Sequence, residues 1–145
     1  MKKNIVWIAL LFSMWSHAQV NWSFTAKKVS DKVYELHCSA SINGGWHIYS
    51  QFTPDGGPVP TEFKFTSNPI ISLEGNVKEV GKMDQHHEPL FGVDVKQFSN
   101  MVDFVQVVKL KAGVKTSCSG TVRYMACDNT QCLPPKEMPF SIGLK

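Results

Sequence analysis

The chain has 145 residues, a formal net charge of +3, and a hydrophobic fraction of 43%. This size suits one domain with a core of its own, and the low charge with scattered lysines excludes a nucleic-acid surface built on a basic run. After the N-terminal residues, no apolar stretch is long enough to cross a membrane as a helix.

The N-terminus has the pattern of a cleaved export signal. Two lysines precede an apolar run, Ile5 to Trp15, that is too short to span a bilayer, and Ser16-His17-Ala18 provides small residues where a signal peptidase cuts. We expect a signal peptide of residues 1–18 and one domain of residues 19–145; an uncleaved membrane anchor is the alternative. Cleavage would place the domain in the periplasm or outside the cell, with a charge of about +1 once Lys2 and Lys3 are lost.

Apolar and polar residues alternate with period two along the rest of the chain, which indicates an all-β fold. The clearest strand covers residues 32–42, where alternate residues from Tyr34 to Ile42 would share one face. Asn43-Gly44-Gly45 predicts a tight turn, and residues 46–50 are expected to be the hairpin partner of that strand. Further strands are expected at residues 22–29, 61–66, 70–73, 77–81, 93–98, 101–110, 116–126 and 138–144.

Two segments between these strands are expected to be loops. Residues 51–60 contain three prolines and two glycines, a composition that interrupts the hydrogen bonding of a sheet. Residues 83–92 are polar and end near an apolar pair, Leu90 and Phe91. This many short strands in one domain indicate a sandwich of two antiparallel sheets, with strand 101–110 at a central position.

Residue types that bind metals occur at two places, but their spacing is poor for chelation. His86 and His87 are adjacent, and neighbouring side chains of an extended segment point in opposite directions. Cys127 and Cys132 are further apart than a usual zinc-binding pair, and no second pair accompanies them. We therefore expect no metal and no cofactor.

Strand phase divides the four cysteines into two pairs. Cys38 and Cys118 share faces with apolar residues of their strands, so both are expected in the core, as a bridge or as two buried thiols. A Cys38–Cys118 bridge is the simplest arrangement for an exported protein with an even cysteine count. Cys127 and Cys132 then form a separate local pair after a strand, where Asp128 favours a turn.

The local pair can serve as a staple or as a site of exchange. A bond that closes so short a loop removes little entropy from the unfolded chain, so its contribution to stability is modest. The residues alone leave two functions open. One is thiol–disulfide exchange, and the other is a secreted immunoglobulin-like binding or adaptor domain with structural disulfides, in which Trp46 packs on the core bridge.

The segment from Tyr124 to Pro135, Tyr-Met-Ala-Cys-Asp-Asn-Thr-Gln-Cys-Leu-Pro-Pro, resembles the active-site segment of the N-terminal periplasmic domain of DsbD, a thiol:disulfide interchange protein. Asn43-Gly44-Gly45-Trp46-His47-Ile48-Tyr49 is similar to the family's Gly-aromatic-x-x-Tyr hairpin, and Glu88-Pro89-Leu90-Phe91-Gly92 stands where the family has its cap loop. The resemblance implies an immunoglobulin-like β-sandwich. Two departures are a loop one residue shorter between the cysteines and a single acid before the cap.

By this resemblance, Cys132 is the sulfur that exchanges with partner disulfides, and Cys127 is the resolving thiol. The family receives electrons from a membrane-embedded thiol reductase and passes them to periplasmic thioredoxin-fold proteins that isomerise disulfides or support cytochrome c maturation. We therefore expect a redox partner protein that depends on a separate membrane protein, rather than a self-sufficient enzyme. The implied cap residues are Leu90 and Phe91, and the implied residues lining the site are Glu88, Tyr49 and His47.

Overall fold

The structure is a computed structural model that describes residues 17–145. Within this part of the chain there are nine strands and no helix, so the prediction of an all-β fold is confirmed. Consistent with this, residues 17–145 contain no helix long and apolar enough to cross a membrane. The predicted signal peptide lies almost entirely outside the described residues, and its cleavage stays a prediction.

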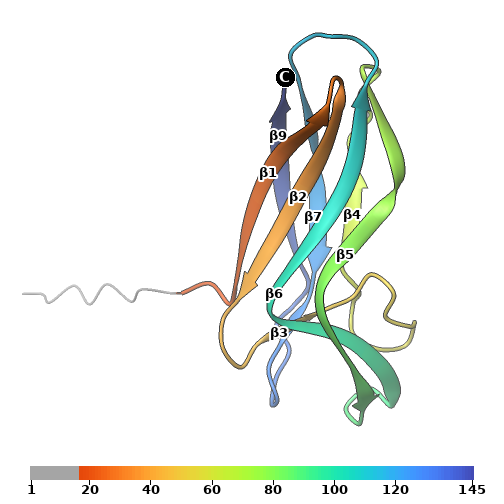
Figure 1. Ribbon diagram of the computed structural model, residues 1–145. Helices are drawn as coiled ribbons and strands as arrows, with labels where there is room; N and C mark the ends of the chain where they lie inside the picture. Colours follow the sequence, from red (N-terminus) through yellow and green to blue (C-terminus); the bar gives the residue numbers. More distant parts are fainter. Residues whose placement is uncertain (1–16) are drawn as a thin grey trace, which may run out of the picture.

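The strands form two antiparallel sheets that face each other as a sandwich (Figure 1). The smaller sheet contains β4 (Glu62–Phe65), β7 (Thr116–Tyr124) and β9 (Lys136–Leu144). The larger sheet contains β1 (Val20–Ser30), β2 (Val33–Ile42), β3 (His47–Tyr49), β5 (Ile71–Glu88), β6 (Val93–Leu110) and β8 (Ala126–Cys127). The predicted sandwich is therefore confirmed.

Strand β6 is the centre of the larger sheet. One of its edges pairs with β5 along almost the whole length, from Ile71↔Leu110 to Glu88↔Val93. The other edge pairs first with β3, at His47↔Ser99, and then with β2, as far as Val33↔Lys109. Because β6 has partners on both sides, it is the central strand that its apolar sequence predicts.

The predicted hairpin between residues 32–42 and 46–50 is wrong. The turn forms as expected, with Gly45 at φ 85° and the Trp46 amide donating to the Asn43 carbonyl at 3.0 Å. It does not return the chain along β2, however, because β3 continues along the same edge of β6 instead. This brings β3 into contact with β8 on its other side, with His47 opposite Cys127.

Two pairs of predicted strands are each one long strand. Residues 71–73, 77–81 and 83–88 all belong to β5, which is interrupted by two register shifts and begins one residue later than predicted. Residues 93–98 and 101–110 both belong to β6. The prediction of a loop over residues 83–88 is wrong because their backbone pairs with β6; only residues 89–92 form a turn. Side chains on both faces of this segment are largely exposed, so apolar alternation does not mark the strand.

The core between the sheets is mainly aliphatic and aromatic. Trp22 is partly buried and packs against this core, with its ring centroid 5.9 Å from that of Phe104 and 5.4 Å from that of Tyr124. Cys38 and Cys118 are both buried there, as their strand phase predicts. Their thiols are free, so the structure has the buried-thiol alternative and not the expected bridge.

The two buried thiols lie in opposite sheets. Cys38 is on β2 of the larger sheet, and Cys118 is on β7 of the smaller one. A buried thiol also packs well as a small apolar group. Burial raises the pKa of Cys38 to about 12 and also raises the pKa of Cys118.

Candidate functional site

Cys127 and Cys132 form a disulfide with their Cα atoms 4.0 Å apart. Cys127 ends β8 and is 1% exposed, whereas Cys132 lies in the following loop and is exposed. The two residues also form an isolated antiparallel bridge with each other. The bond thus joins an inner cysteine to an outer one, and only the outer residue is open to another protein.

The loop between these cysteines is held by its own hydrogen bonds. The Asp128 carboxylate accepts from the backbone amides of Thr130 and Gln131, both at 2.8 Å, and these amides lower the pKa of Asp128. The Asp128 amide donates to the Gln131 carbonyl at 2.9 Å, and the Leu133 amide donates to the Ala126 carbonyl at 2.9 Å. The turn that Asp128 predicts is therefore present, and it fixes the path of the chain between the two sulfurs.

A small apolar cluster, separate from the core between the sheets, surrounds the inner cysteine. Its buried members are Tyr49, Val95, Met125 and Cys127. Met125 lies where the chain passes from β7 in the smaller sheet to β8 in the larger one. We call this group the inner cluster; it separates Cys127 from water.

The turn at residues 89–92 carries the predicted cap. The Phe91 and Gly92 amides donate to the Glu88 carbonyl at 3.2 and 2.8 Å, and the Leu90 amide donates to the Glu88 side chain at 3.2 Å. Phe91 is partly buried and packs against the inner cluster, whereas Leu90 is 70% exposed. The two predicted cap residues therefore have different surroundings, since Phe91 packs against the inner cluster and Leu90 faces solvent.

His47 and Tyr49 are both buried beside this cluster, and His47 Nε2 lies 3.0 Å from Tyr49 Oη. Burial lowers the pKa of His47, while the nearby Glu88 carboxylate acts in the opposite direction. Burial, with a further contribution from Glu88, raises the pKa of Tyr49 to about 12. At neutral pH the pair thus consists of an imidazole and a phenol that are both uncharged.

The structure brings most of the residues that the sequence singled out into one place. Cys127, Tyr49 and Phe91 are in contact through the inner cluster, His47 pairs with Cys127 across two strands, and Glu88 holds the cap turn. Sequence reasoning missed Val95 and Met125, whose signal is only the ordinary apolar pattern of a strand. It also missed Asp84 and His86 as residues that influence His47 electrostatically.

The two adjacent histidines do not act together. His86 has its two ring nitrogens 3.1 Å from the Asp84 carboxylate and 3.5 Å from the Glu88 carboxylate, whereas His87 lies 3.0 Å from Asp94. Among residues 17–145, no group of three or more histidine, cysteine or acidic side chains is arranged to hold a metal ion.

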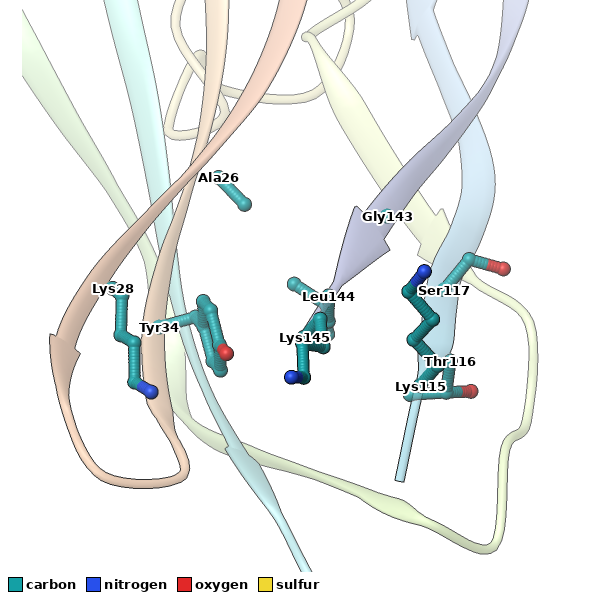
Figure 2. Close-up of a pocket in the computed structure, with 9 residues that line it drawn as sticks. All are labelled: Ala26, Lys28, Tyr34, Lys115, Thr116, Ser117, Gly143, Leu144 and Lys145. Atoms are coloured by element: carbon teal, nitrogen blue, oxygen red, sulfur yellow. The ribbon is translucent and has the colours of Figure 1, made fainter. Parts of the chain in front are cut away.

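A hollow of about 700 Å³ is lined by residues around the end of β9 (Figure 2). Figure 1 shows that this end of the sandwich lies opposite the end at which the chain leaves β7 for the cysteine loop. Tyr34 and Leu144 line the hollow together with Lys28, Lys115 and Lys145. None of the predicted site residues contributes to this hollow. The disulfide itself lies at the surface, where a protein partner can approach it more readily than a small molecule could be enclosed.

Comparison with known families gives one match that covers most of the chain. Residues 16–142 match the family described as thiol:disulfide interchange protein DsbD, N-terminal. Comparison with curated proteins found no match.

Solved structures share the fold at low sequence identity. The N-terminal periplasmic domain of ScsB from Proteus mirabilis has 19% identity and a TM-score of 0.56 over 89% of this chain, which spans only 46% of that one. The DsbD N-terminal domain of Neisseria meningitidis in its reduced form has 16% identity and a TM-score of 0.52, covering 79% of this chain and 78% of that one. A complex between the DsbD and PilB N-terminal domains of the same organism has 12% identity and a TM-score of 0.50, covering 84% and 80%.

Proposed function

Because the chain belongs to the family of DsbD N-terminal domains, we propose that it is a periplasmic thiol–disulfide exchange module that relays electrons through Cys127 and Cys132. The observation that carries this proposal is the unequal exposure of the two bonded cysteines. Exchange needs one sulfur that a partner can reach and a second, protected thiol that resolves the mixed disulfide. Cys132 is exposed and Cys127 is 1% exposed, which suits these two roles in that order.

In the reducing direction, the Cys132 thiolate attacks a disulfide of the partner. The partner's S–S bond breaks, a mixed disulfide forms, and one partner sulfur leaves as a thiolate. Cys127 then attacks Cys132, which restores the Cys127–Cys132 bond and releases the second partner thiolate. Two electrons pass to the partner, and the same steps in reverse reload the domain from a dithiol donor.

For the partners, we propose thioredoxin-fold proteins as electron acceptors and a separate membrane-embedded thiol reductase as the donor. Support for a protein partner comes from the complex formed by the Neisseria meningitidis DsbD and PilB N-terminal domains, which shares this fold. We further propose that residues 1–18 are a signal peptide, that residues 19–145 are one domain, and that it acts in the periplasm.

Phe91 has the surroundings that the cap role requires. It packs on the inner cluster that contains Cys127, and the turn that carries it is fastened by the Glu88 carbonyl and carboxylate. We propose that Phe91 shields the disulfide from small oxidants and thiols, and that exposed Leu90 contacts the partner when the turn moves aside.

The proposal predicts different outcomes for the two cysteines. With a thioredoxin-fold protein as substrate, Cys132→Ser should abolish exchange, whereas Cys127→Ser should accumulate a mixed disulfide because no resolving thiol remains. Non-reducing electrophoresis and mass spectrometry would detect this adduct. Cys118→Ala is the matched control and should exchange normally, since its thiol is buried between the sheets.

Unchanged exchange in both site variants would refute the proposal. The competing function, a secreted binding domain with structural disulfides, predicts a reduction potential for the Cys127–Cys132 pair well below about −300 mV. An exchanging pair should have a higher potential. The structure has a single disulfide among residues 17–145, and so it lacks the core bridge that the binding-domain alternative uses.

A further inference from the structure

His47 occupies a position that the exchange steps above leave without a role. It lies directly across the β3–β8 pair from Cys127, and directly opposed residues of antiparallel strands point to the same face with Cβ atoms about 5 Å apart. Both residues are buried, at 8% and 1% exposure. Tyr49, which belongs to the inner cluster with Cys127, holds the imidazole through Nε2 at 3.0 Å. The ring is therefore a fixed, buried neighbour of the inner cysteine.

The titratable groups around His47 come from two other segments. Strand β5 contributes Glu88, His86 and Asp84, and the cysteine loop contributes Asp128. From β6, the directly paired residue is Ser99, which does not titrate. Burial keeps the pKa of His47 below its ordinary value, so the ring is uncharged near pH 7, while the three carboxylates favour its protonated form. The surroundings thus combine a neutral imidazole with carboxylates that stabilise it once it gains a proton.

The inner cysteine, Cys127, needs a group that accepts its thiol proton, whereas the outer cysteine, Cys132, does not. The thiolate is the attacking form of a cysteine, and apolar burial disfavours it. Cys132 is exposed and can release its proton to water, but Cys127 is enclosed by the inner cluster and cannot do so easily. We infer that His47 is the general base of the resolving step, accepting the proton of the Cys127 thiol as Cys127 attacks Cys132. This inference rests on the exchange function proposed above.

The proton and the sulfur bonds of the resolving step can each be followed. In the tautomer in which Tyr49 Oη accepts from Nε2–H, the other ring nitrogen of His47 carries the lone pair and takes the proton of Cys127. The Cys127 sulfur bonds to the Cys132 sulfur, the bond between Cys132 and the partner sulfur breaks, and the partner leaves as a thiolate. The imidazolium then returns its proton to water or to that thiolate. No electrons move except the two of the exchange itself.

The test separates the resolving step from the attack that precedes it. Reduced full-length protein is mixed in a stopped-flow apparatus with less than one equivalent of 5,5′-dithiobis(2-nitrobenzoic acid). Attack by Cys132 releases a first coloured thiolate, and resolution by Cys127 releases a second. In His47→Gln we expect the first phase to keep its rate and the second to slow about 10²-fold at pH 7, the lower end of general-base effects.

The dependence on pH gives a readout that a merely structural role would not change. In the native protein the second phase should become independent of pH once His47 is uncharged, because the base is then fully available. In His47→Gln the second phase should instead rise about tenfold per pH unit in neutral solution, following the Cys127 thiolate. His37→Gln is the matched control, since His37 pairs with Asp103 on the larger sheet and belongs to no part of the site. It should leave both phases unchanged.

The outcomes separate the role of His47 from the thiol–disulfide exchange function on which it depends. A second phase in His47→Gln with native rate and native pH dependence would overturn the role of His47 and leave the exchange function intact. A native protein that gives no fast first phase would overturn the exchange function itself. If circular dichroism shows that His47→Gln does not fold, His47→Asn provides the same comparison with a smaller side chain.

Discussion

Two pairs of cysteines lie in this one domain, and their surroundings give them opposite chemistry. Cys38 and Cys118 lie between the sheets, at 2% and 3% exposure, with free thiols. Cys127 and Cys132 are bonded where the chain leaves β8, and the second of them is exposed. Burial raises the pKa of Cys38 to about 12 and so suppresses its thiolate. The comparison teaches that backbone placement, and not the residue type, decides which cysteines can exchange.

The largest expected difference between the pairs is in reactivity. In the reduced, folded protein, iodoacetamide should alkylate Cys132 at least about 10³-fold faster than Cys38 or Cys118, because the core thiols become accessible only when the domain opens at several kcal/mol. Mass spectrometry of peptides after timed labelling would measure the ratio. In concentrated urea, all four cysteines should label at similar rates. Rapid labelling of Cys38 in the folded protein would contradict the idea that burial makes the core thiols unreactive.

The second difference concerns the free energy of unfolding, to which the core cysteines should contribute although they do not take part in exchange. Cys38→Ser places a hydroxyl without a hydrogen-bond partner in the core, and we expect it to lower the free energy of unfolding by about 2 kcal/mol. Urea denaturation would measure this change, with Cys38→Ala as the control for lost volume. Exchange activity of the folded fraction should remain native. A Cys38→Ser protein as stable as Cys38→Ala would mean that the core accommodates the polar group.

The smallest expected effect is on the reduction potential of the Cys127–Cys132 pair, through the loop between these two cysteines. In Asp128→Ala, the loop loses the carboxylate that accepts from the Thr130 and Gln131 amides, so the two thiols meet less often and the disulfide is easier to reduce. The reduction potential should rise by up to about 30 mV, equivalent to a tenfold change in the exchange equilibrium. Equilibration with glutathione buffers would measure it, and Asp31→Ala, in the distant β1–β2 turn, is the control.

The effect of Asp128→Ala should depend on pH through the titration of the Asp128 carboxylate. The amides lower the pKa of Asp128 in the folded domain, so its contribution is complete above the ordinary pKa of an aspartate and is lost only as pH falls through the lowered value. Between pH 5 and 8 the shift caused by Asp128→Ala should therefore be constant, apart from the titration of the thiols. A shift that disappears within this range would point to another group.

Local signals in the sequence predicted local structure well. The alternation from Tyr34 to Ile42 identified β2 and the buried position of Cys38, and Asp128 identified the turn between the exchanging cysteines. These features depend on residues a few positions apart, whose side chains and backbone interact directly.

Long-range pairing could not be predicted in the same way. The turn at Asn43-Gly44-Gly45 is compatible with a simple hairpin, and only the presence of β6 shows that the chain moves on to a new partner. The polar strand at residues 83–88 has no buried face to reveal it. The neighbourhood of Cys127, Tyr49 and Phe91 joins three distant segments, and the family resemblance suggested it where periodicity did not.

The cysteine loop is the most local part of the site, which has a consequence for the order of events during folding. Its sulfurs are five positions apart in the chain, so they can meet in the unfolded polypeptide within the time of a short loop closure. His47 and Phe91 reach the same place only after the long-range pairing of β3, β5, β6 and β8, which forms more slowly. Where an oxidant of thiols is present, the loop can therefore become oxidised before the chain has assembled the groups that cover the bond, and we expect the domain to enter its first cycle as the disulfide.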